Sequence, residues 1–427
     1  MKNEYRTLKP YLLLWSTQSL SALGSAMTNF ALVIWLYQQS GSALQTALLS
    51  ICSYAPYVLM SIFAGAVSDR WNKKRTMLVC DFLAASGTIA IFGLLKAGVL
   101  LPWHMYVLNA FNGLMNTVQQ PASEVAASLL IPKDFYQKTS ALRSFSQSLN
   151  TILVPVFAAA LYALAGMKLV IAVDLGTFSL AFLTLLFLPI PEQKAENKTH
   201  EAVFASAGKG LAWLRLHPLI LNLILFLACI NLVASAYDAA LPAMILSREN
   251  GSEAVLGLVN SCVGLACLAG SLLAMGMPAP KDRVRAICAA LFLSMSTENF
   301  LLAFGRTPLI WCIGAVLGWL GIPLMNANMD VIFRRTIPTD MQGRVYACRN
   351  TLQFFTIPLG YFLGGLLVDT VFEPLLAAQP DGSALIRLFG MGKGSGAAML
   401  FSVLGIAGVA VCLLFTRILR RYHWHET

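Results

Sequence analysis

The chain has 427 residues, of which 57% are hydrophobic and only 12% are charged, and its mean hydropathy is +0.69. Soluble globular proteins carry about 25% charged residues, so the composition excludes an ordinary water-soluble domain. A net charge of +10 would suit nucleic acid in a soluble protein. Here the basic residues lie between long apolar runs, so we expect a lipid bilayer and no nucleic acid as partner.

The apolar runs are about 20 residues long, which is enough to cross roughly 30 Å of hydrocarbon as a helix. Inside lipid the backbone must satisfy its own hydrogen bonds, which leaves helices or a closed barrel. The runs do not alternate, so a barrel is excluded. We expect an all-α integral membrane protein with twelve spans. In chain order they are 11–38, 44–68, 76–97, 103–130, 139–165, 168–190, 218–246, 253–277, 286–304, 308–333, 345–371 and 396–417.

The spans divide into two groups of six. One group lies in residues 1–190 and the other in 218–427, and the polar stretch 191–217 is expected to be a cytoplasmic linker. When both termini are placed in the cytoplasm, the inner segments hold 24 of the 30 Lys and Arg residues. Because positive residues favour the cytoplasmic side, we predict a multi-pass protein of the cell membrane with both ends inside.

A short sequence recurs once in each half. Residues 131–143 read IPKDFYQKTSALR and residues 337–349 read IPTDMQGRVYACR, 206 positions later. Both copies fall in cytoplasmic connections, between spans 4 and 5 and between spans 10 and 11. The same offset relates Glu124 to Asp330. Two equivalent halves predict a transporter built from parallel repeats, with the substrate path between them.

The connection between spans 2 and 3 reads GAVSDRWNKKR over residues 65–75. Its cations follow the positive-inside rule, whereas Asp69 beside them indicates an ion-pair cluster. Gly65 allows another helix to approach closely. The pattern Gly65-xxx-Asp69-Arg70-xxx-Lys74-Arg75 resembles the signature loop of the major facilitator superfamily. That resemblance implies that these five residues form a latch against spans 4 and 11.

Other stretches are similar to the macrolide-efflux proteins and their drug/proton antiporter relatives. They are LLLWSTQSLSALGSAM in span 1, TVQQPA before Ile131, and FEPL followed by FGMGKGSGAAMLF before span 12. The resemblance covers most of the chain. It implies two pseudo-symmetric six-helix bundles in the major facilitator fold, and a monomeric transporter rather than an enzyme. It also implies that a proton gradient supplies the energy and that no cofactor or metal is needed.

Polar side chains recur at helical spacing in four of the spans. Steps of three or four residues place them on one face of each helix. The resemblance implies that spans 1, 4, 7 and 10 face a central cavity, and amides turned toward lipid would be costly. Hydrogen bonding between packed helices is the alternative. The expected cavity residues are Gln18, Ser25, Asn29, Asn109, Asn112, Asn116, Gln119, Asn231, Ser235, Trp319 and Asn326.

The acids in the spans separate by depth. Glu124 and Asp330 lie near the cytoplasmic ends of their helices, where Arg143 and Arg349 open the following spans. We expect these four residues, together with Asp69, to form ion pairs of an inner gate. Such pairs would hold the outward-facing state and would break for inward opening.

Three deeper acids are candidates for proton coupling. A carboxyl group held away from water can exchange a proton near neutral pH. Asp238 is the first candidate because its polar stripe faces the expected cavity, and Asp174 and Glu298 follow. The alternative for each is a buried acid paired with a polar neighbour.

The leading hypothesis is a proton-driven exporter of an amphipathic small molecule that works by alternating access. A second hypothesis keeps the fold but exports an endogenous metabolite such as a siderophore. A membrane receptor or enzyme without transport is the third. The sequence holds no nucleophile–base set and no metal-ligand spacing to support it.

Overall fold

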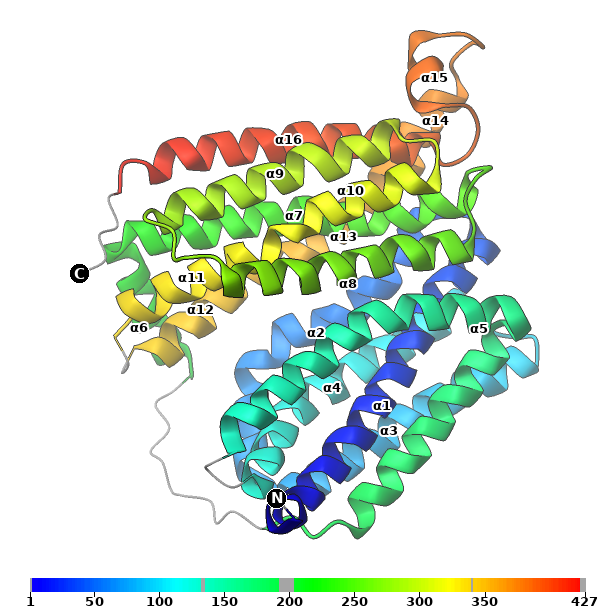
Figure 1. Ribbon diagram of the computed structural model, residues 1–427. Helices are drawn as coiled ribbons and strands as arrows, with labels where there is room; N and C mark the ends of the chain where they lie inside the picture. The colour runs from blue at the N-terminus through cyan, green and yellow to red at the C-terminus, as the bar shows by residue number, and fades with distance from the viewer. Residues whose placement is uncertain (1, 132–134, 192–202, 339–340, 423–427) are drawn as a thin grey trace. The chain divides into compact units, whose positions relative to one another are not determined.

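The computed structural model describes residues 2–131, 135–191, 203–338 and 341–422, and every regular element in these ranges is a helix. The all-α prediction is therefore confirmed. Figure 1 shows the helices coloured along the chain. They form two compact units: Met1–Leu36 with Leu49–His200, and Tyr37–Leu48 with Glu201–Thr427.

The first unit contains most of five helices, with bounds that follow the apolar runs. Asn72 caps the third of them by accepting a hydrogen bond from the backbone N–H of Arg75 at 3.0 Å, and Pro102 begins the fourth. The helices are α1 (Lys2–Ser40), α2 (Ala43–Arg70), α3 (Lys73–Lys96), α4 (Pro102–Leu130) and α5 (Tyr136–Phe187).

α5 is two helices joined by a sharp break. Ala165 and Gly166 leave the helical conformation, and Gly166 has φ 67°, which a glycine adopts without strain. The break lies between the fifth and sixth predicted spans, so α5 supplies both. The core of the unit is apolar, with Leu32 of α1, Met105 of α4 and Ile171 of α5 fully buried in one cluster.

The second unit contains the remaining helices. Ser252 and Asp282 cap two of them, and Pro218 and Pro308 begin two others. They are α6 (Val203–Leu216), α7 (Pro218–Ser247), α8 (Glu253–Gly276), α9 (Arg283–Phe304), α10 (Pro308–Leu320), α11 (Ile322–Thr336), α12 (Gln342–Phe354), α13 (Thr356–Leu367), the π-helical turn η2 (Val368–Phe372), α14 (Glu373–Ala377), α15 (Ala384–Phe389) and α16 (Ser395–Leu419).

Ten helices of the described residues are long and apolar enough to cross a membrane. One of these ten contains the α5 break and so covers two predicted spans. The polar α4 is not among the ten, although its 29 residues exceed the length that a bilayer requires. The predicted twelve spans are consistent with this count.

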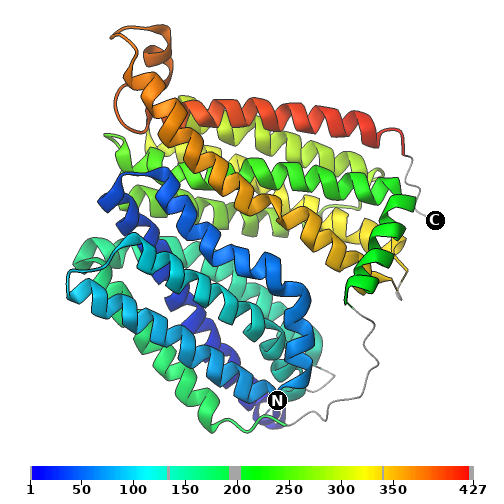
Figure 2. The ribbon, with the colours of Figure 1, turned by 180° about the vertical axis from the view of Figure 1, so that it is seen from behind.

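Two predicted spans are interrupted in the structure. Gly321 separates α10 from α11 within span 10, and the run from α12 to α14 that covers span 11 contains η2. Figure 2 shows α12 and α13 of that run lying against α7.

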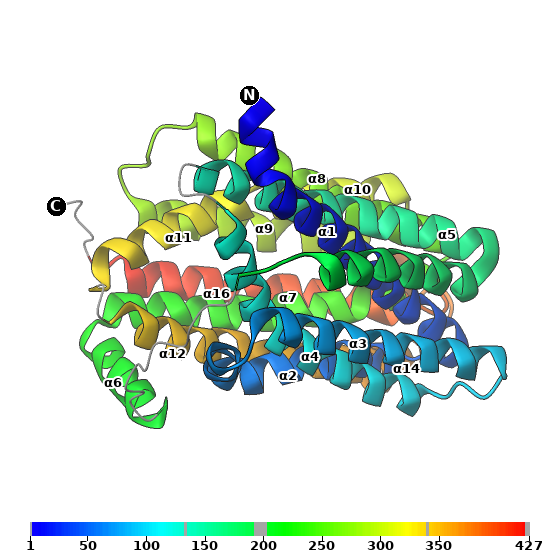
Figure 3. The ribbon, with the colours of Figure 1, turned by 90° about the horizontal axis from the view of Figure 1, so that it is seen from below.

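The stretch 191–217, expected to be a linker, contains a helix in its second part. The apolar residues of VFASAGKGLAWLRL form α6, which packs on α12 (Figure 3).

The connection between α1 and α2 belongs to the second unit. The Tyr37 hydroxyl group lies 2.6 Å from Ser247 Oγ and donates to the carbonyl oxygen of Ala243 at 3.2 Å. Asp369, in η2, accepts hydrogen bonds from Ser42 Oγ at 2.6 Å and from the first backbone N–H groups of α2 at 2.9–3.0 Å. An acid more than 300 residues away in the chain thus caps α2.

Candidate functional site

A polar cavity of about 290 Å³ lies within the first unit, between α1, α3, α4 and α5. Helical spacing directs the amides of α1 and α4 to this common space. Seven expected cavity residues line it: Gln18, Ser25, Asn29, Asn109, Asn112, Asn116 and Gln119. The structure therefore brings together every residue that the sequence placed in a cavity from spans 1 and 4.

Asp174 of α5 closes one side of this cavity. Its side chain is only 3% exposed and accepts hydrogen bonds from Ser25 Oγ at 3.0 Å and from Thr28 Oγ1 at 2.8 Å. Gly24 makes this approach of α5 to α1 possible, because a Cβ atom there would collide with Thr177 and press on Asp174. Hydroxyl donors thus satisfy a buried carboxyl group that has no cation bonded to it among the described residues.

Asp81 of α3 is a second carboxyl group in the same cavity. Gln119 Nε2 of α4 donates to one of its oxygen atoms at 2.6 Å, and Gln18 Nε2 of α1 donates to the other at 3.3 Å. Our sequence reasoning missed Asp81. The signal was an acid inside the apolar run 76–97, and an acid in a membrane span is a functional candidate by default.

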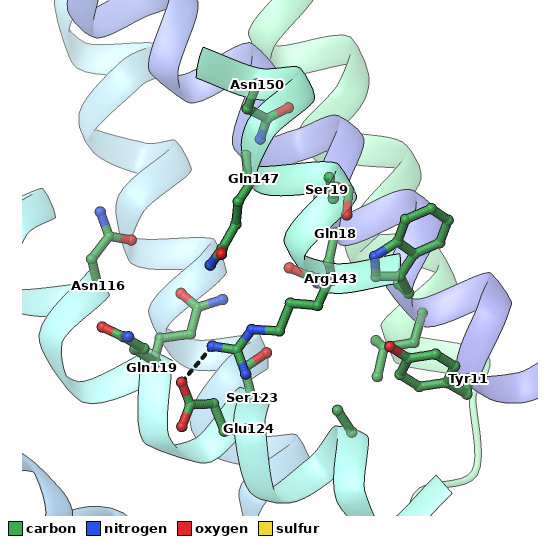
Figure 4. A pocket seen from close by; sticks show the side chains of 16 residues that line it. Tyr11, Gln18, Ser19, Asn116, Gln119, Ser123, Glu124, Arg143, Gln147 and Asn150 are labelled. Atoms are coloured by element: carbon green, nitrogen blue, oxygen red, sulfur yellow. Dashed lines mark hydrogen bonds and ion pairs between the residues drawn. The ribbon is translucent and has the colours of Figure 1, made fainter. Parts of the chain in front are cut away.

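A second cavity, of about 370 Å³, shares Gln18, Asn116 and Gln119 with the first (Figure 4). Tyr11 and Trp15 of α1 line it, and further amides come from α4 and α5. Near its wall Arg143 Nη2 lies 2.6 Å from Glu124 Oε1. The structure thus brings together the expected gate pair of the first half.

This ion pair is half exposed, with 50% of the Arg143 side chain and 47% of the Glu124 side chain accessible. Water screens such a pair, which contributes about 0.2–1 kcal/mol. We expect Glu124→Gln to lower the melting temperature in detergent by less than about 4 °C. Adding Arg143→Gln to that variant should change little more. A fall beyond about 8 °C would show that the pair carries the stability of the unit.

In the second unit, Glu298 and Asp238 lie in different surroundings. Glu298 is 4% exposed, accepts a hydrogen bond from Trp319 Nε1 at 3.0 Å, and packs on Gly318, where a side chain would collide with it. Asp238 is exposed and accepts one hydrogen bond, from the Tyr361 hydroxyl group at 3.4 Å. Trp319 is therefore hydrogen-bonded to the buried Glu298, whereas the side chain of Asp238 is accessible.

The other expected residues of this half do not gather in one place. Asn231 Nδ2 donates to the carbonyl oxygen of Gln353 at 3.1 Å, and Ser235 is buried and donates to its own helix at Asn231 O. Asn326 of α11 is exposed. For Asn231 and Ser235 the structure shows packing between helices, which is the alternative that the sequence left open.

The gate pair expected in the second half is not formed among the described residues. Arg349 Nε donates to Gln353 Oε1 at 3.0 Å, and the guanidinium group lies 4.7 Å from the centre of the Phe333 ring. One helical turn separates Arg349 from Gln353. Asp330 is exposed and acts on Arg349 electrostatically, without a direct ion pair among the described residues. The direct contact of Glu124 with Arg143 is therefore not repeated by Asp330 and Arg349 in this part of the structure.

The expected latch loop is described in part. Lys74 Nζ donates to the carbonyl oxygens of Leu186 and Leu188 at 2.9 and 2.8 Å, which ties α3 to the end of α5. Arg75 is exposed. The side chains of Gly65, Asp69 and Arg70 lie outside the described residues, as do positions 132–134 and 339–340 of the repeated loops.

Comparison with known proteins gives several relatives. The chain is 23% identical over 364 residues to macrolide efflux protein A of Streptococcus pyogenes, covering 84% of this chain and 89% of that protein. It is 24% identical over 372 residues to the multidrug efflux pump Tap of Mycolicibacterium fortuitum, with 84% and 89% coverage. It is 25% identical over 334 residues to the enterobactin exporter EntS of Shigella flexneri, with 75% and 76% coverage.

Solved structures share the fold. A mutant of the nucleoside transporter NupG matches with a TM-score of 0.70 at 12% identity, over 96% of this chain and 99% of that chain. A bacterial homologue of the iron transporter ferroportin, in an inward-facing state, matches with a TM-score of 0.66 at 16% identity, over 96% and 99%. The family profile described as Major Facilitator Superfamily matches residues 14–244. The chain belongs to that superfamily and is a membrane transporter of its type, not an enzyme.

Proposed function

We propose that this chain exports amphipathic compounds such as macrolides, in exchange for protons and by alternating access. The observation that carries the proposal is the pair of adjoining cavities in the first unit, which are lined by amides; Asp81 and Asp174 line the smaller cavity and Glu124 lines the larger one. Amides bind the many oxygen atoms of such a compound, and Tyr11 and Trp15 supply aromatic surface. The efflux proteins among the relatives support this substrate class.

For proton coupling we propose Asp238 first, then Asp174 and Glu298. Asp238 is exposed and accepts a hydrogen bond from the Tyr361 hydroxyl group, so a proton can reach it and leave it. Asp174 and Glu298 are almost fully buried and each is held by donors on a neighbouring helix. The proton gradient is the energy source, and the mechanism uses no cofactor.

We further propose that the protein works as a monomer in the cell membrane with both termini in the cytoplasm. The end of α4 that carries Glu124 then faces the cytoplasm, where the Glu124–Arg143 pair contributes to an inner gate. The distribution of Lys and Arg along the chain supports this orientation.

Export of an iron-chelating metabolite is the second candidate function, favoured by the relative that exports enterobactin. The two functions separate in a host that lacks its own pumps. The drug hypothesis predicts that the wild-type gene raises the inhibitory concentration of macrolides several-fold, whereas the second predicts more siderophore in the medium and no drug resistance.

Transport itself is tested with purified protein in vesicles. An imposed pH gradient should drive uptake of a labelled macrolide into inside-out vesicles, and a proton ionophore should stop it. Uptake that is equal with and without the gradient would exclude proton coupling. The absence of movement of any compound in a broad panel would favour a receptor.

A further inference from the structure

Asp81 lines the smaller cavity of the first unit and is hydrogen-bonded to two neighbouring helices. Its carboxyl group lies on α3, and the two amides that donate to it come from α1 and α4. Gln18 and Gln119 also line both cavities. Protonation of Asp81 would therefore change the hydrogen bonds of Gln18 and Gln119, and both of these side chains line the two cavities.

The charges around Asp81 leave it without a fixed counter-ion. Among the described residues, Asp81 shares the smaller cavity with Gln18 of α1, Gln119 of α4 and Asp174 of α5. The charged groups Glu124 of α4 and Arg143 of α5, and Tyr11 of α1, line the adjoining larger cavity. Arg143 pairs with Glu124, and Asp174 is held by hydroxyl groups. Among the described residues, the amide N–H groups of Gln18 and Gln119 are the donors to Asp81, so a proton or a cationic occupant would stabilise the site further.

The hydrogen-bonding rules of these groups make the network a switch. An ionised carboxylate can only accept, so each glutamine turns its NH₂ group toward Asp81 and leaves its carbonyl oxygen for the cavity. A protonated carboxyl group carries an O–H donor that needs an acceptor. One glutamine must then turn its carbonyl oxygen to Asp81 and present NH₂ to the cavity instead.

We propose that Asp81 binds and releases a proton in the transport cycle and that Gln18 and Gln119 relay this event to the substrate. With Asp81 ionised, the two amides offer oxygen atoms that bind hydrogen-bond donors of the substrate, namely ammonium or hydroxyl groups. Protonation of Asp81 rotates the side-chain amide of one glutamine and so removes one acceptor oxygen from the cavity. The site then binds the ammonium or hydroxyl groups of the substrate more weakly. This inference rests on the proposed function and adds a substrate class, a compound rich in amine or hydroxyl donors.

Infrared difference spectroscopy of the purified full-length protein tests the switch without any substrate. Acidification across about pH 5–9 should produce a carboxylic acid C=O band together with a change in the side-chain amide bands of isotope-labelled glutamine. Both changes should share one midpoint and both should be lost in Asp81→Asn. Persistence of every carboxyl band in this variant would overturn the proposal.

A second variant covers the case in which Asp81→Asn does not fold. Gln119→Leu removes one donor to the ionised form, so the midpoint of the coupled change should shift measurably from that of the wild type. The control Asp381→Asn removes an exposed carboxyl group outside both cavities and should keep the coupled carboxyl and glutamine changes. A midpoint that Gln119→Leu leaves unchanged would also overturn the proposal.

A failed drug assay is distinguishable from failure of this inference. If macrolides are not substrates but the coupled infrared change is lost in Asp81→Asn, the switch stands and the proposed drug class falls. If macrolides are exported while Asp81→Asn keeps wild-type spectra and the wild-type pH profile of transport, the proposed function stands and the switch falls.

Discussion

Replacement of Asp238 by asparagine is expected to reduce proton-driven macrolide efflux to the level of vesicles without the transporter. The amide has nearly the shape of the carboxyl group and can still accept the hydrogen bond from Tyr361, so the fold should be retained. It cannot carry a proton, so coupling is lost. The measurement is efflux of a labelled macrolide under an imposed pH gradient, normalised to the amount of transporter in the membrane.

The control for this experiment is Tyr361→Phe, which removes the donor and leaves the carboxyl group of Asp238. This variant should keep efflux, with an altered dependence on pH because one stabilising hydrogen bond to the ionised form is gone. Wild-type efflux together with wild-type pH dependence in Asp238→Asn would refute the assignment. Proton coupling would then be assigned to Asp174 or to Asp81 with its two glutamines.

Replacement of Gly360 by leucine is expected to cause the largest loss of stability. Gly360 and Gly364 form a GxxxG pair on α13, and a Cβ atom at either position would meet the backbone of α7 at Leu232 or Ala236. The helices must separate to admit a side chain. Overpacking of this kind costs about 1–3 kcal/mol, so the melting temperature in detergent should fall by about 2–12 °C.

Gly176→Leu provides the matched control. Gly176 also lies inside a long helix, α5, but a Cβ atom there meets nothing within 4 Å. Because leucine favours a helix more than glycine does, this variant should be as stable as the wild type or slightly more so. Equal melting temperatures for the two variants would show that close packing of α7 and α13 does not limit stability.

The structure brings together the polar residues of spans 1 and 4 but not those of spans 7 and 10, for one physical reason. Spacing of three to four residues shows that side chains share a helix face, and it does not show what that face meets. On α1 and α4 the common face borders a cavity. On α7 the same kind of face, with Asn231 and Ser235, packs against α12 and α13.

The internal repeat has the same limitation as a guide to contacts. Equal spacing suggested that Asp330 and Arg349 would pair as Glu124 and Arg143 do. Phe333 and Gln353 compete for the arginine, and neither the offset nor the spacing indicates which contact is favoured. Contacts far apart in sequence, such as that of Asp369 with the start of α2, leave no local pattern at all.

The assignment of residues 37–48 to the second unit bears on how far the two halves are interchangeable. Two similar halves suggest that one half could be exchanged between relatives at a single junction near residue 200. In this chain such an exchange would separate Asp369 from the start of α2, which it caps, and Ala243 and Ser247 from Tyr37. An exchange that keeps these contacts must therefore replace residues 37–48 together with the second half, so the exchanged unit consists of two separate segments of the gene.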